Sequence, residues 1–356
     1  MKKVVFILFL FILPYTVKAY SSSATSTIVM DTDNNRIIYA NNVHKVRSVA
    51  SISKIMTAIL AIESGKLEDK IEVGSEINGV YGSAIYISQG EILTLKDLVY
   101  GLMLRSGNDA SYVIANYVGG SIKNFVDLMN KKAKEIGMKN TSFNNPNGLD
   151  DNGGNISTAY DMALLSSYAI KNDIYKKVVN TRKYNLKTNK NVYSWTNKNK
   201  LLNMYEYAVG GKTGYTDIAK RTLVTNASKN NVNLTIVTLN DGDDFNDHIK
   251  LYEEAFNEYN NYEILKEGYL ELVDEKYYPN RRFFIKENFN YLLNDNEKNH
   301  IVLKFYLDKK ITYNDGDEIG SVHVYIGDKK IFETNLYVEL KKKKIRIIDI
   351  ILGWFK

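Results

Sequence analysis

A serine and a lysine three residues apart are the first candidates for chemistry in this sequence. Ser51 and Lys54 form its only Ser-x-x-Lys, and Ile55, Ile59 and Ile62 recur after them at helical spacing, so both polar side chains should share one helix face. A serine is a poor nucleophile without a neighbouring base, and a lysine is a base only if burial or a second cation lowers its pKa. The spacing indicates an activated serine, with a capping serine and a surface lysine as the alternative.

Two further motifs carry side chains of the kinds that bind substrate. Ser106 and Asn108 follow a run of helical spacing, but Ser-x-Asn also starts at Ser142 and at Ser228, so by itself it fits a turn between helices. Lys212-Thr213-Gly214 occurs once, just before a predicted hairpin. At a sheet edge this lysine and threonine would hold a carboxylate, and the glycine would admit an extended substrate backbone. Alone, the motif also fits a strand start with a turn glycine.

In this order, the three motifs resemble the signature set of penicillin-binding proteins and serine β-lactamases. Over about residues 25–260 the chain is similar to the low-molecular-mass, serine-type D-alanyl-D-alanine carboxypeptidases. The similar segments are Val49–Ala58, Leu104–Ala110, Phe143–Leu149, Ser157–Ala163, Thr196–Leu202, Gly211–Thr216 and Gly242–Asp247. The resemblance implies an α/β (α+β) fold: a β-lactamase/transpeptidase-like domain whose antiparallel sheet is flanked by helices, then a small all-β domain and a C-terminal amphipathic helix.

The resemblance also implies catalytic roles for Ser51, Lys54, Ser106, Asn108 and Lys212. Ser51 would attack the carbonyl between two D-alanines, and Lys54 would act as its base. Ser106 would pass the proton to the departing amine. Asn108 would hold both the substrate amide and Lys54. The expected reaction is removal of the terminal D-alanine from peptidoglycan stem peptides ending in D-Ala-D-Ala, through an acyl-enzyme, with β-lactams as inhibitors and no metal or organic cofactor.

The third motif would provide most of the substrate-binding groups. Lys212 and Thr213 would bind the terminal carboxylate, and Lys212 would also lower the pKa of Lys54. Gly214 would lie along the substrate backbone. The backbone N–H groups of Ser51 and Tyr215 would form the oxyanion hole.

Two positions depart from the pattern of many relatives, and several other functions compete. Asn147 stands where many relatives have histidine, and Lys220 where many have glycine. A class A β-lactamase needs a glutamate in a Glu-x-x-Leu-Asn sequence between the second and third motifs, where this chain has only Glu135 and Glu206 in other contexts. A D,D-endopeptidase, a non-catalytic wall-binding protein and a Ser-His-Asp hydrolase are further alternatives. The hydrolase alternative is disfavoured because this sequence has no Gly-x-Ser-x-Gly motif.

Composition narrows the classes of protein. The chain has 356 residues, 44% of them hydrophobic and 25% charged, which fits two folded domains with tails. It has no cysteine and four scattered histidines, which argues against thiol, Fe–S and zinc chemistry. The net charge of +6 comes from the two ends, so no basic surface for nucleic acid is expected on the body.

The two ends predict where the protein works. Residues 1–19 begin with Lys2 and Lys3, followed by an apolar run and small residues before a cleavage point, which is typical of a secretory signal peptide; an uncleaved anchor is the alternative. Residues 341–356 combine four lysines with an isoleucine-rich segment. As a helix this segment is too short to span a bilayer but can lie on its surface. A final helix packed on the protein itself is the alternative. We expect an exported, extracytoplasmic protein attached to the outer face of the membrane.

The elements that must position the motifs follow from hydrophobic periodicity. Residues 25–50 predict a hairpin, 51–64 and 95–137 predict helices, and 221–240 predict a second hairpin. Such an order suggests one antiparallel sheet built from both ends of a catalytic domain, 20–261, with helices packed around it. Short alternating runs over 262–340 predict the small β-rich domain.

Overall fold

A computed structural model describes residues 20–272, 276, 278–308 and 312–340. The predicted signal peptide, 1–19, and the predicted amphipathic helix, 341–356, lie outside the described residues. The chain forms two compact units, one of Met1–Ser228 with Asn233–Ala255 and one of Lys229–Val232 with Phe256–Lys356. None of the helices in the described part of the chain is long and apolar enough to cross a membrane.

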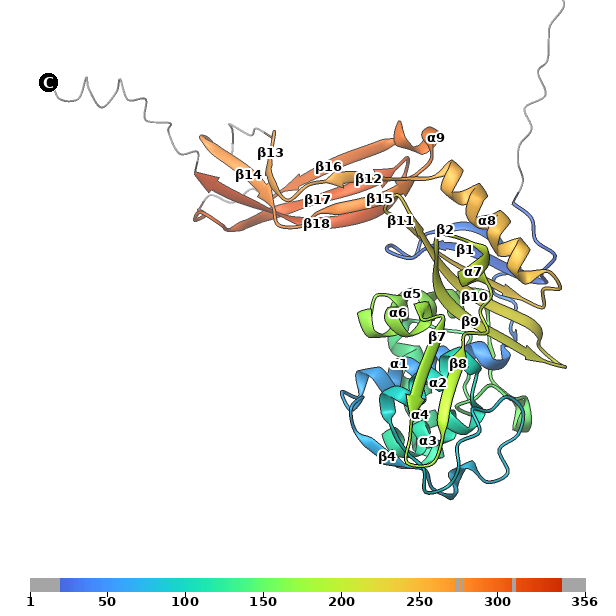
Figure 1. The fold of residues 1–356 in the computed structure, drawn as a ribbon. Coiled ribbons are helices and arrows are strands. Elements are labelled where there is room, and N and C mark those ends of the chain that lie inside the picture. Colours follow the sequence, from blue (N-terminus) through green and yellow to red (C-terminus); the bar gives the residue numbers. More distant parts are fainter. Residues whose placement is uncertain (1–19, 273–275, 277, 309–311, 341–356) are drawn as a thin grey trace, which may run out of the picture. The chain divides into compact units, whose positions relative to one another are not determined.

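The first unit is built on a five-stranded sheet whose strands come from both ends of the unit (Figure 1). Its order is β2 (Ile37–Asn41), β1 (Ser26–Asp31), β11 (Val232–Leu239), β10 (Lys220–Lys229) and β9 (Ala208–Thr216). The pairs β1–β2, β1–β11 and β9–β10 are antiparallel. This arrangement confirms the predicted sheet, and it makes β9, which carries the Lys-Thr-Gly motif, an edge strand.

Helices and short sheets fill the sequence between β2 and β9. The predicted helical run over 95–137 is three helices, because Ser106 and Gly120 adopt left-handed φ angles of 64° and 70° that end the first two. The helices are α1 (Lys54–Glu63), α2 (Leu95–Arg105), α3 (Asn108–Gly119), α4 (Ile122–Ile136), α5 (Ala159–Ile170), α6 (Asp173–Asn180) and α7 (Leu201–Met204), with 3₁₀ turns η1 (Ala50–Ser53), η2 (Ser75–Ile77) and η3 (Asp151–Gly153). Short antiparallel pairs join β3 (Arg47–Ser48) to β6 (Ile156–Ser157), β4 (Lys70–Glu72) to β5 (Ile92–Thr94) and β7 (Lys183–Lys187) to β8 (Val192–Thr196).

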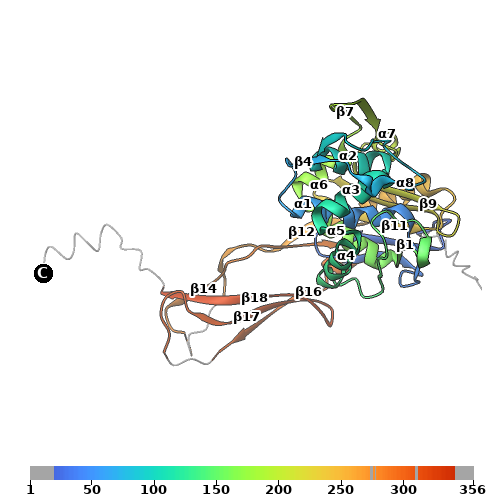
Figure 2. The same ribbon diagram turned by 90° about the horizontal axis from the view of Figure 1, so that it is seen from below.

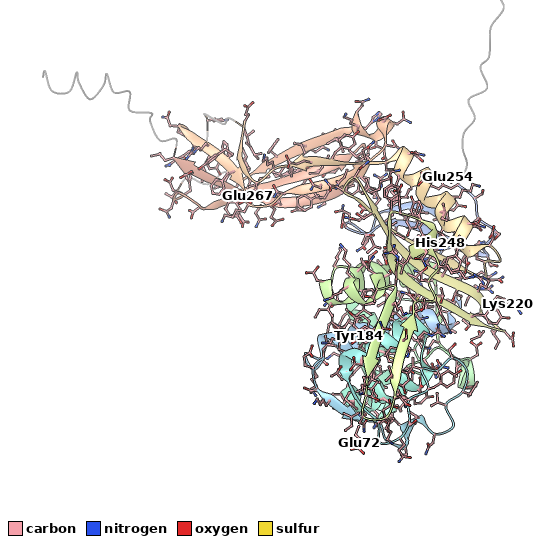
Figure 3. All side chains as sticks on the ribbon, viewed as in Figure 1. Glu72, Tyr184, Lys220, His248, Glu254 and Glu267 are labelled. Atoms are coloured by element: carbon pink, nitrogen blue, oxygen red, sulfur yellow. The ribbon has the colours of Figure 1, made fainter. Side chains whose placement is uncertain are left out.

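The sheet has a core on each face. On one face Val224, Val237 and Leu239 join the main apolar core formed with α1 to α6. On the other face lies α8 (Asp244–Glu258), whose His248 contacts Thr225 of β10 and Thr238 of β11. Figure 1 shows α8 and the helices α1 to α6 on different sides of these strands, Figure 2 shows the same elements from below, and Figure 3 labels His248 beside α8. The turn η1, which precedes α1, contacts β9, so the serine in this turn lies beside the edge strand.

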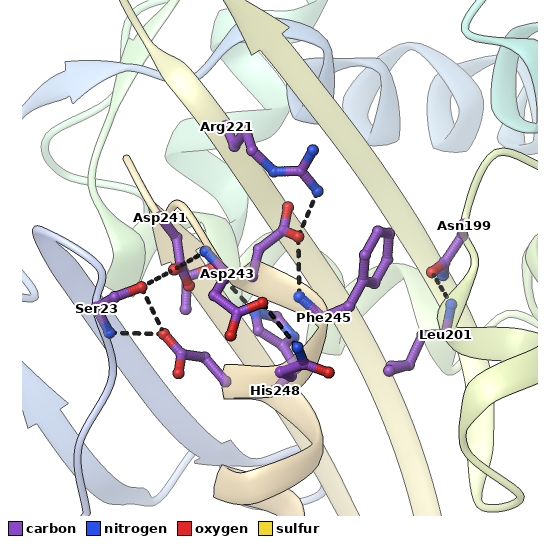
Figure 4. A network of polar contacts seen from close by, with 12 residues as sticks. Ser23, Asn199, Leu201, Arg221, Asp241, Asp243, Phe245 and His248 are labelled. Carbon is purple, nitrogen blue, oxygen red and sulfur yellow. Dashed lines mark hydrogen bonds and ion pairs between the residues drawn. The ribbon is translucent and has the colours of Figure 1, made fainter.

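Polar contacts fix the start of α8 (Figure 4). Ser23 Oγ donates to Asp241 Oδ1 at 2.6 Å and to Asp247 Oδ2 at 2.9 Å. Arg221 of β10 forms an ion pair with Asp244 at 2.5 Å. These bonds tie the segment before β1 and the strand β10 to one helix end, where acidic side chains also interact favourably with the helix dipole.

The second unit is a β structure with its own core. One sheet has the order β13 (Gly268–Leu270), β14 (Arg281–Ile285), β18 (Lys329–Leu340), β17 (Glu318–Ile326) and β16 (Ile301–Leu307), and β12 (Asn260–Leu265) pairs with β15 (Phe289–Leu293). Phe283, Val322 and Leu336 are among its buried residues. The predicted all-β character is confirmed apart from one short helix, α9 (Asp295–Lys298), which a capping box from Asn294 stabilises.

Candidate active site

Ser51 is presented by a strained turn at the start of α1. Ala50 has a φ of 50°, and the turn η1 leads directly into α1, whose first residue is Lys54. Ser51 is partly exposed, whereas Lys54 has no exposed surface. The Nζ of Lys54 lies 3.0 Å from the Oγ of Ser51. The predicted pair is therefore in contact, and the alternative of a surface lysine is wrong.

Two acceptors on other segments hold the amine of Lys54. Its Nζ lies 2.7 Å from Asn108 Oδ1 and also donates to the carbonyl oxygen of Asn147. Neither oxygen can donate a hydrogen bond. A neutral amine has two N–H bonds and one lone pair, so when both N–H bonds point to these oxygens the lone pair is left facing Ser51. This geometry suits Lys54 to accept the proton of the serine hydroxyl.

Asparagines orient the carbonyl of Asn147. The Oδ1 of Asn145 accepts from the backbone N–H groups of Asn147, at 3.2 Å, and Gly148, at 2.7 Å. The Oδ1 of Asn155 accepts from the N–H of Asn145 at 3.1 Å. Sequence reasoning missed this carbonyl, because the contact depends on backbone geometry and not on a side-chain type.

The second motif lies in the link between α2 and α3. The left-handed conformation of Ser106 ends α2 and turns its hydroxyl toward β9, where Lys212 Nζ donates to Ser106 Oγ at 3.1 Å. Asn108 begins α3. Both residues are almost fully buried. The link is a turn between helices, which was the alternative prediction for this motif. It also places the Ser106 hydroxyl beside Lys212 and the Asn108 amide beside Lys54.

The third motif runs along the edge strand β9 beside η1. A Cβ added to Gly214 would lie 3.0 Å from the backbone nitrogen of Ser51 and 2.4 Å from Thr222 Oγ1, so only glycine leaves room here. Thr213 is partly exposed, and its carbonyl accepts from Lys212 Nζ at 2.6 Å. Tyr215 is 59% exposed. The strand therefore runs close to the N–H of Ser51, next to the nucleophile.

Burial and mutual repulsion weaken the basicity of three lysines. Burial, together with the charges of Lys212 and Lys198, holds the pKa of Lys54 well below its usual value. Burial, with Lys198 nearby, lowers the pKa of Lys212 to about 7. Burial and the charge of Arg105 lower the pKa of Lys198. Lys54 is thus driven toward the neutral form that a general base requires.

The structure adds residues that the motifs did not single out. Lys198 lies in one of the segments that resemble the carboxypeptidases, and its Nζ donates to Ser83 Oγ at 3.1 Å. Asp109, directly after the Ser-x-Asn motif, accepts from backbone N–H groups of the segment around Ile85. Its charge opposes the loss of the proton from Lys54. Among the residues that the structure describes, no cluster of three His, Asp or Glu side chains could hold a metal ion.

Lys220, one of the two departures from the pattern, has a physical explanation. It lies at the start of β10, at the end of the β9–β10 hairpin (Figure 3), with a φ of 59°. This left-handed conformation favours glycine, so the lysine is accommodated here at a small cost in strain. Its side chain is exposed, and none of the described contacts joins it to the motif residues.

Family models match both parts of the chain. The model for D-alanyl-D-alanine carboxypeptidase matches residues 14–243. The model for the C-terminal domain of penicillin-binding protein 5 matches residues 259–344. The first match corresponds to the first structural unit, and the second match to the second unit.

Individual relatives agree with the family models. The chain is 38% identical over 215 residues to the D-alanyl-D-alanine carboxypeptidase DacF of Bacillus subtilis, covering 59% of this chain and 55% of the relative. It is 34% identical over 256 residues to DacC of Escherichia coli, covering 68% of this chain and 63% of the relative. The chain thus aligns with less than two thirds of each relative's length.

Solved structures cover more of the chain. Penicillin-binding protein 5 of Haemophilus influenzae superposes with a TM-score of 0.76 at 25% identity, covering 91% of this chain and 98% of that one. The carboxypeptidase DacD of Francisella tularensis superposes with a TM-score of 0.70 at 25% identity, covering 95% and 96%. The fold of both units is therefore one already seen in such proteins.

Proposed function

Because the chain belongs to the D-alanyl-D-alanine carboxypeptidase family, we propose that it is a serine-type D,D-carboxypeptidase that removes the terminal D-alanine from peptidoglycan stem peptides. The observation that supports this most directly is the contact of the buried amine of Lys54 with the hydroxyl of Ser51, 3.0 Å away. In this proposal the reaction proceeds through an ester between Ser51 and the substrate.

Acylation begins with transfer of the serine proton to Lys54. The Oγ of Ser51 attacks the carbonyl between the two D-alanines, and the new C–O bond gives a tetrahedral intermediate with a negative oxygen. The C–N bond then breaks as the carbonyl re-forms. The departing amine takes a proton from the hydroxyl of Ser106. Ser106 is reprotonated by the proton that Lys54 took from Ser51, so Lys54 becomes neutral again, and Lys212, whose Nζ lies 3.1 Å from the Ser106 oxygen, keeps its charge. Protons and electron pairs balance without any cofactor.

Binding of the substrate follows from the charges and the edge strand. Lys212 and Thr213 would hold the terminal carboxylate, and Asn108 would hold the amide of the acyl part. The N–H groups of Ser51 and Tyr215 would stabilise the negative oxygen of the tetrahedral intermediate, where losing one donor typically costs about a hundredfold in rate or more. The approach of Gly214 to the Ser51 nitrogen supports this pair.

Release of the acyl group requires water. A water molecule would attack the ester with Lys54 again as base. The same site could accept the longer leaving group of a cross-link, which is the endopeptidase variant. A β-lactam would acylate Ser51 in the same way as the peptide.

The place of action is part of this proposal. A signal peptide at 1–19 would export the protein, and the helix at 341–356 would attach it to the outer face of the membrane, near the cell wall. The four lysines at the start of that segment would interact with anionic lipid.

Mass spectrometry with a penicillin tests the proposal. The purified protein should gain the mass of one penicillin, and Ser51→Ala should gain none. A peptide ending in D-Ala-D-Ala should lose one D-alanine only with the unsubstituted protein. Absence of an adduct on the unsubstituted protein would refute the proposal, and rapid, complete hydrolysis of nitrocefin would point instead to a β-lactamase.

A further inference from the structure

Tyr81 connects two segments that the catalytic motifs do not include. Its backbone carbonyl accepts from Asn108 Nδ2 at 2.7 Å. Its hydroxyl donates to the carboxylate of Asp151, whose two oxygens lie 2.6 and 2.7 Å away. The tyrosine side chain is 56% exposed, so this bond lies at the surface while the carbonyl of the same residue reaches the buried site.

The segment that contains Tyr81 is fixed to the start of α3. The N–H of Asn108 donates to the carbonyl of Ser83 at 2.7 Å. The carboxylate of Asp109 accepts from the N–H groups of Ile85, at 3.0 Å, and Tyr86, at 2.8 Å. Because the Tyr81 carbonyl accepts from the amide nitrogen of Asn108, the amide oxygen must face Lys54. The segment therefore sets the orientation of one of the two acceptors on the Lys54 amine.

The segment that contains Asp151 supplies the other acceptor. Four residues before Asp151, the carbonyl of Asn147 accepts from Lys54. Asp150 accepts from Ser48 Oγ at 2.5 Å. The bond between Tyr81 and Asp151 thus joins, at the surface, the two segments that each hold one N–H of Lys54.

We propose that Tyr81 is a positioning residue for the reaction, whose hydroxyl ties the segment 147–151 to the segment that orients Asn108 and so fixes the amine of Lys54 against Ser51. This inference rests on the proposed function, since it concerns the same nucleophile and base. Tyr81 itself touches none of the reacting atoms in this role.

Loss of the hydroxyl has a specific consequence at the base. Without the bond to Asp151, the two acceptors can move apart and water can reach the amine. Hydration favours the charged form, so the pKa of Lys54 moves back toward its ordinary value. The charged groups that act on Lys54, which are Lys212, Lys198 and Asp109, are unchanged by removal of a phenol hydroxyl. Small displacements of a base are costly in rate.

The rate of acylation by a penicillin, measured against pH on the full chain, tests the proposal. We expect Tyr81→Phe to acylate about tenfold more slowly at neutral pH, with the rise of rate with pH shifted to higher pH. Asp151→Ala should behave in the same way. Asp151→Asn keeps an oxygen that accepts from the phenol and should restore most of the rate. The matched control is Tyr117→Phe, which removes another exposed bond between a tyrosine and an aspartate, Tyr117 to Asp69 at 2.5 Å.

The outcomes separate this inference from the proposed function. The inference is overturned if Tyr81→Phe keeps the rate and pH profile of the unsubstituted protein, or slows acylation without moving the profile. It is also overturned if the double variant loses rate by the product of the two single losses. Tyr81→Phe and Asp151→Ala remove the same hydrogen bond, so together they should cost little more than either alone. Failure of the unsubstituted protein to acylate would instead refute the proposed function.

Discussion

At the scale of single residues, the chemistry depends on two lysines that cannot both carry a charge at low cost. Lys54 and Lys212 are both buried, and each charge is penalised by desolvation. The pKa of Lys54 is lowered by burial and also by the charge of Lys212. The proposed mechanism needs this division, with one neutral amine as base and one cation for the substrate carboxylate.

The pH dependence of kcat/KM should report both lysines. It should rise with pH as Lys54 loses its proton and fall again above about pH 7, where Lys212 loses its own. In Lys212→Gln the repelling charge is gone, so the pKa of Lys54 rises and the ascending limb should move to higher pH, with a large loss of kcat/KM. Release of D-alanine from a peptide ending in D-Ala-D-Ala, measured from pH 5 to pH 10, gives the profile.

Lys123→Gln is the matched control for that profile. Lys123 carries the same charge on a side chain that is 85% exposed, and it pairs with Asp127 on the surface of α4. Its substitution should leave both limbs in place, since exposed ion pairs contribute little. If the rise of kcat/KM with pH occurs at the same pH in Lys212→Gln, Lys212 does not affect the pKa of Lys54.

At the scale of elements, the turn η1 depends on a neighbouring glycine. Gly148 has a φ of 84°, and an added Cβ would lie 2.1 Å from the carbonyl of Ala50 and 2.6 Å from Ser53 Oγ. Gly148→Ala should therefore displace η1, lower the free energy of unfolding by about 1–3 kcal/mol and slow acylation of Ser51. Urea unfolding and penicillin acylation measure the two effects. Gly242→Ala, where nothing lies within 4 Å of the added Cβ, should change neither by much, and equal effects of the two variants would contradict this explanation.

The packing of α8 on the sheet should make stability depend on pH. His248 is fully buried between Thr225 and Thr238, and burial lowers its pKa to about 3 from an ordinary 6.5. The unfolded chain therefore binds a proton below pH 6.5 that the folded chain does not. The free energy of unfolding should fall as pH falls from 6.5 toward 3, by about 1.4 kcal/mol per pH unit from this residue.

Comparison with His248→Gln isolates that contribution. Burial raises the pKa of Asp31 and Asp241, so these groups act in the opposite direction and remain in the variant. Urea unfolding at several pH values between 4 and 7.5 should give a smaller loss of stability on acidification in His248→Gln. Identical slopes in the two proteins would rule out a role for His248.

At the scale of the whole molecule, the candidate site belongs entirely to the first unit. Each unit has its own buried core, and the residues from Ser51 to Tyr215 all lie in the first. Catalysis and attachment to a membrane should therefore be separable. Deleting residues 341–356 should move the protein from the membrane fraction to the soluble fraction, with acylation of Ser51 unchanged. Retention of the shortened protein in the membrane fraction would contradict a surface-binding tail.

Several features of this protein could be predicted because they depend on local sequence. The hairpin β10–β11 turns at Asn230 and Asn231, which adopt φ values of 51° and 62°, and asparagine tolerates this conformation better than most residues. Helical spacing after Ser51 placed Lys54 on the same face. The three motifs in order indicated the family, and the family models confirm that prediction.

The sequence specifies which reactive groups this protein has, but their protonation states and their partners depend on how distant segments pack together. A lysine is a base or a surface cation according to its burial, and the burial of Lys54 comes from packing against segments distant along the chain. The carbonyl of Asn147 and the bond between Tyr81 and Asp151 join segments about 70–95 residues from their partners. Such contacts leave no periodic pattern in the sequence, because they depend on where the backbone of each loop lies once the sheet and helices have assembled.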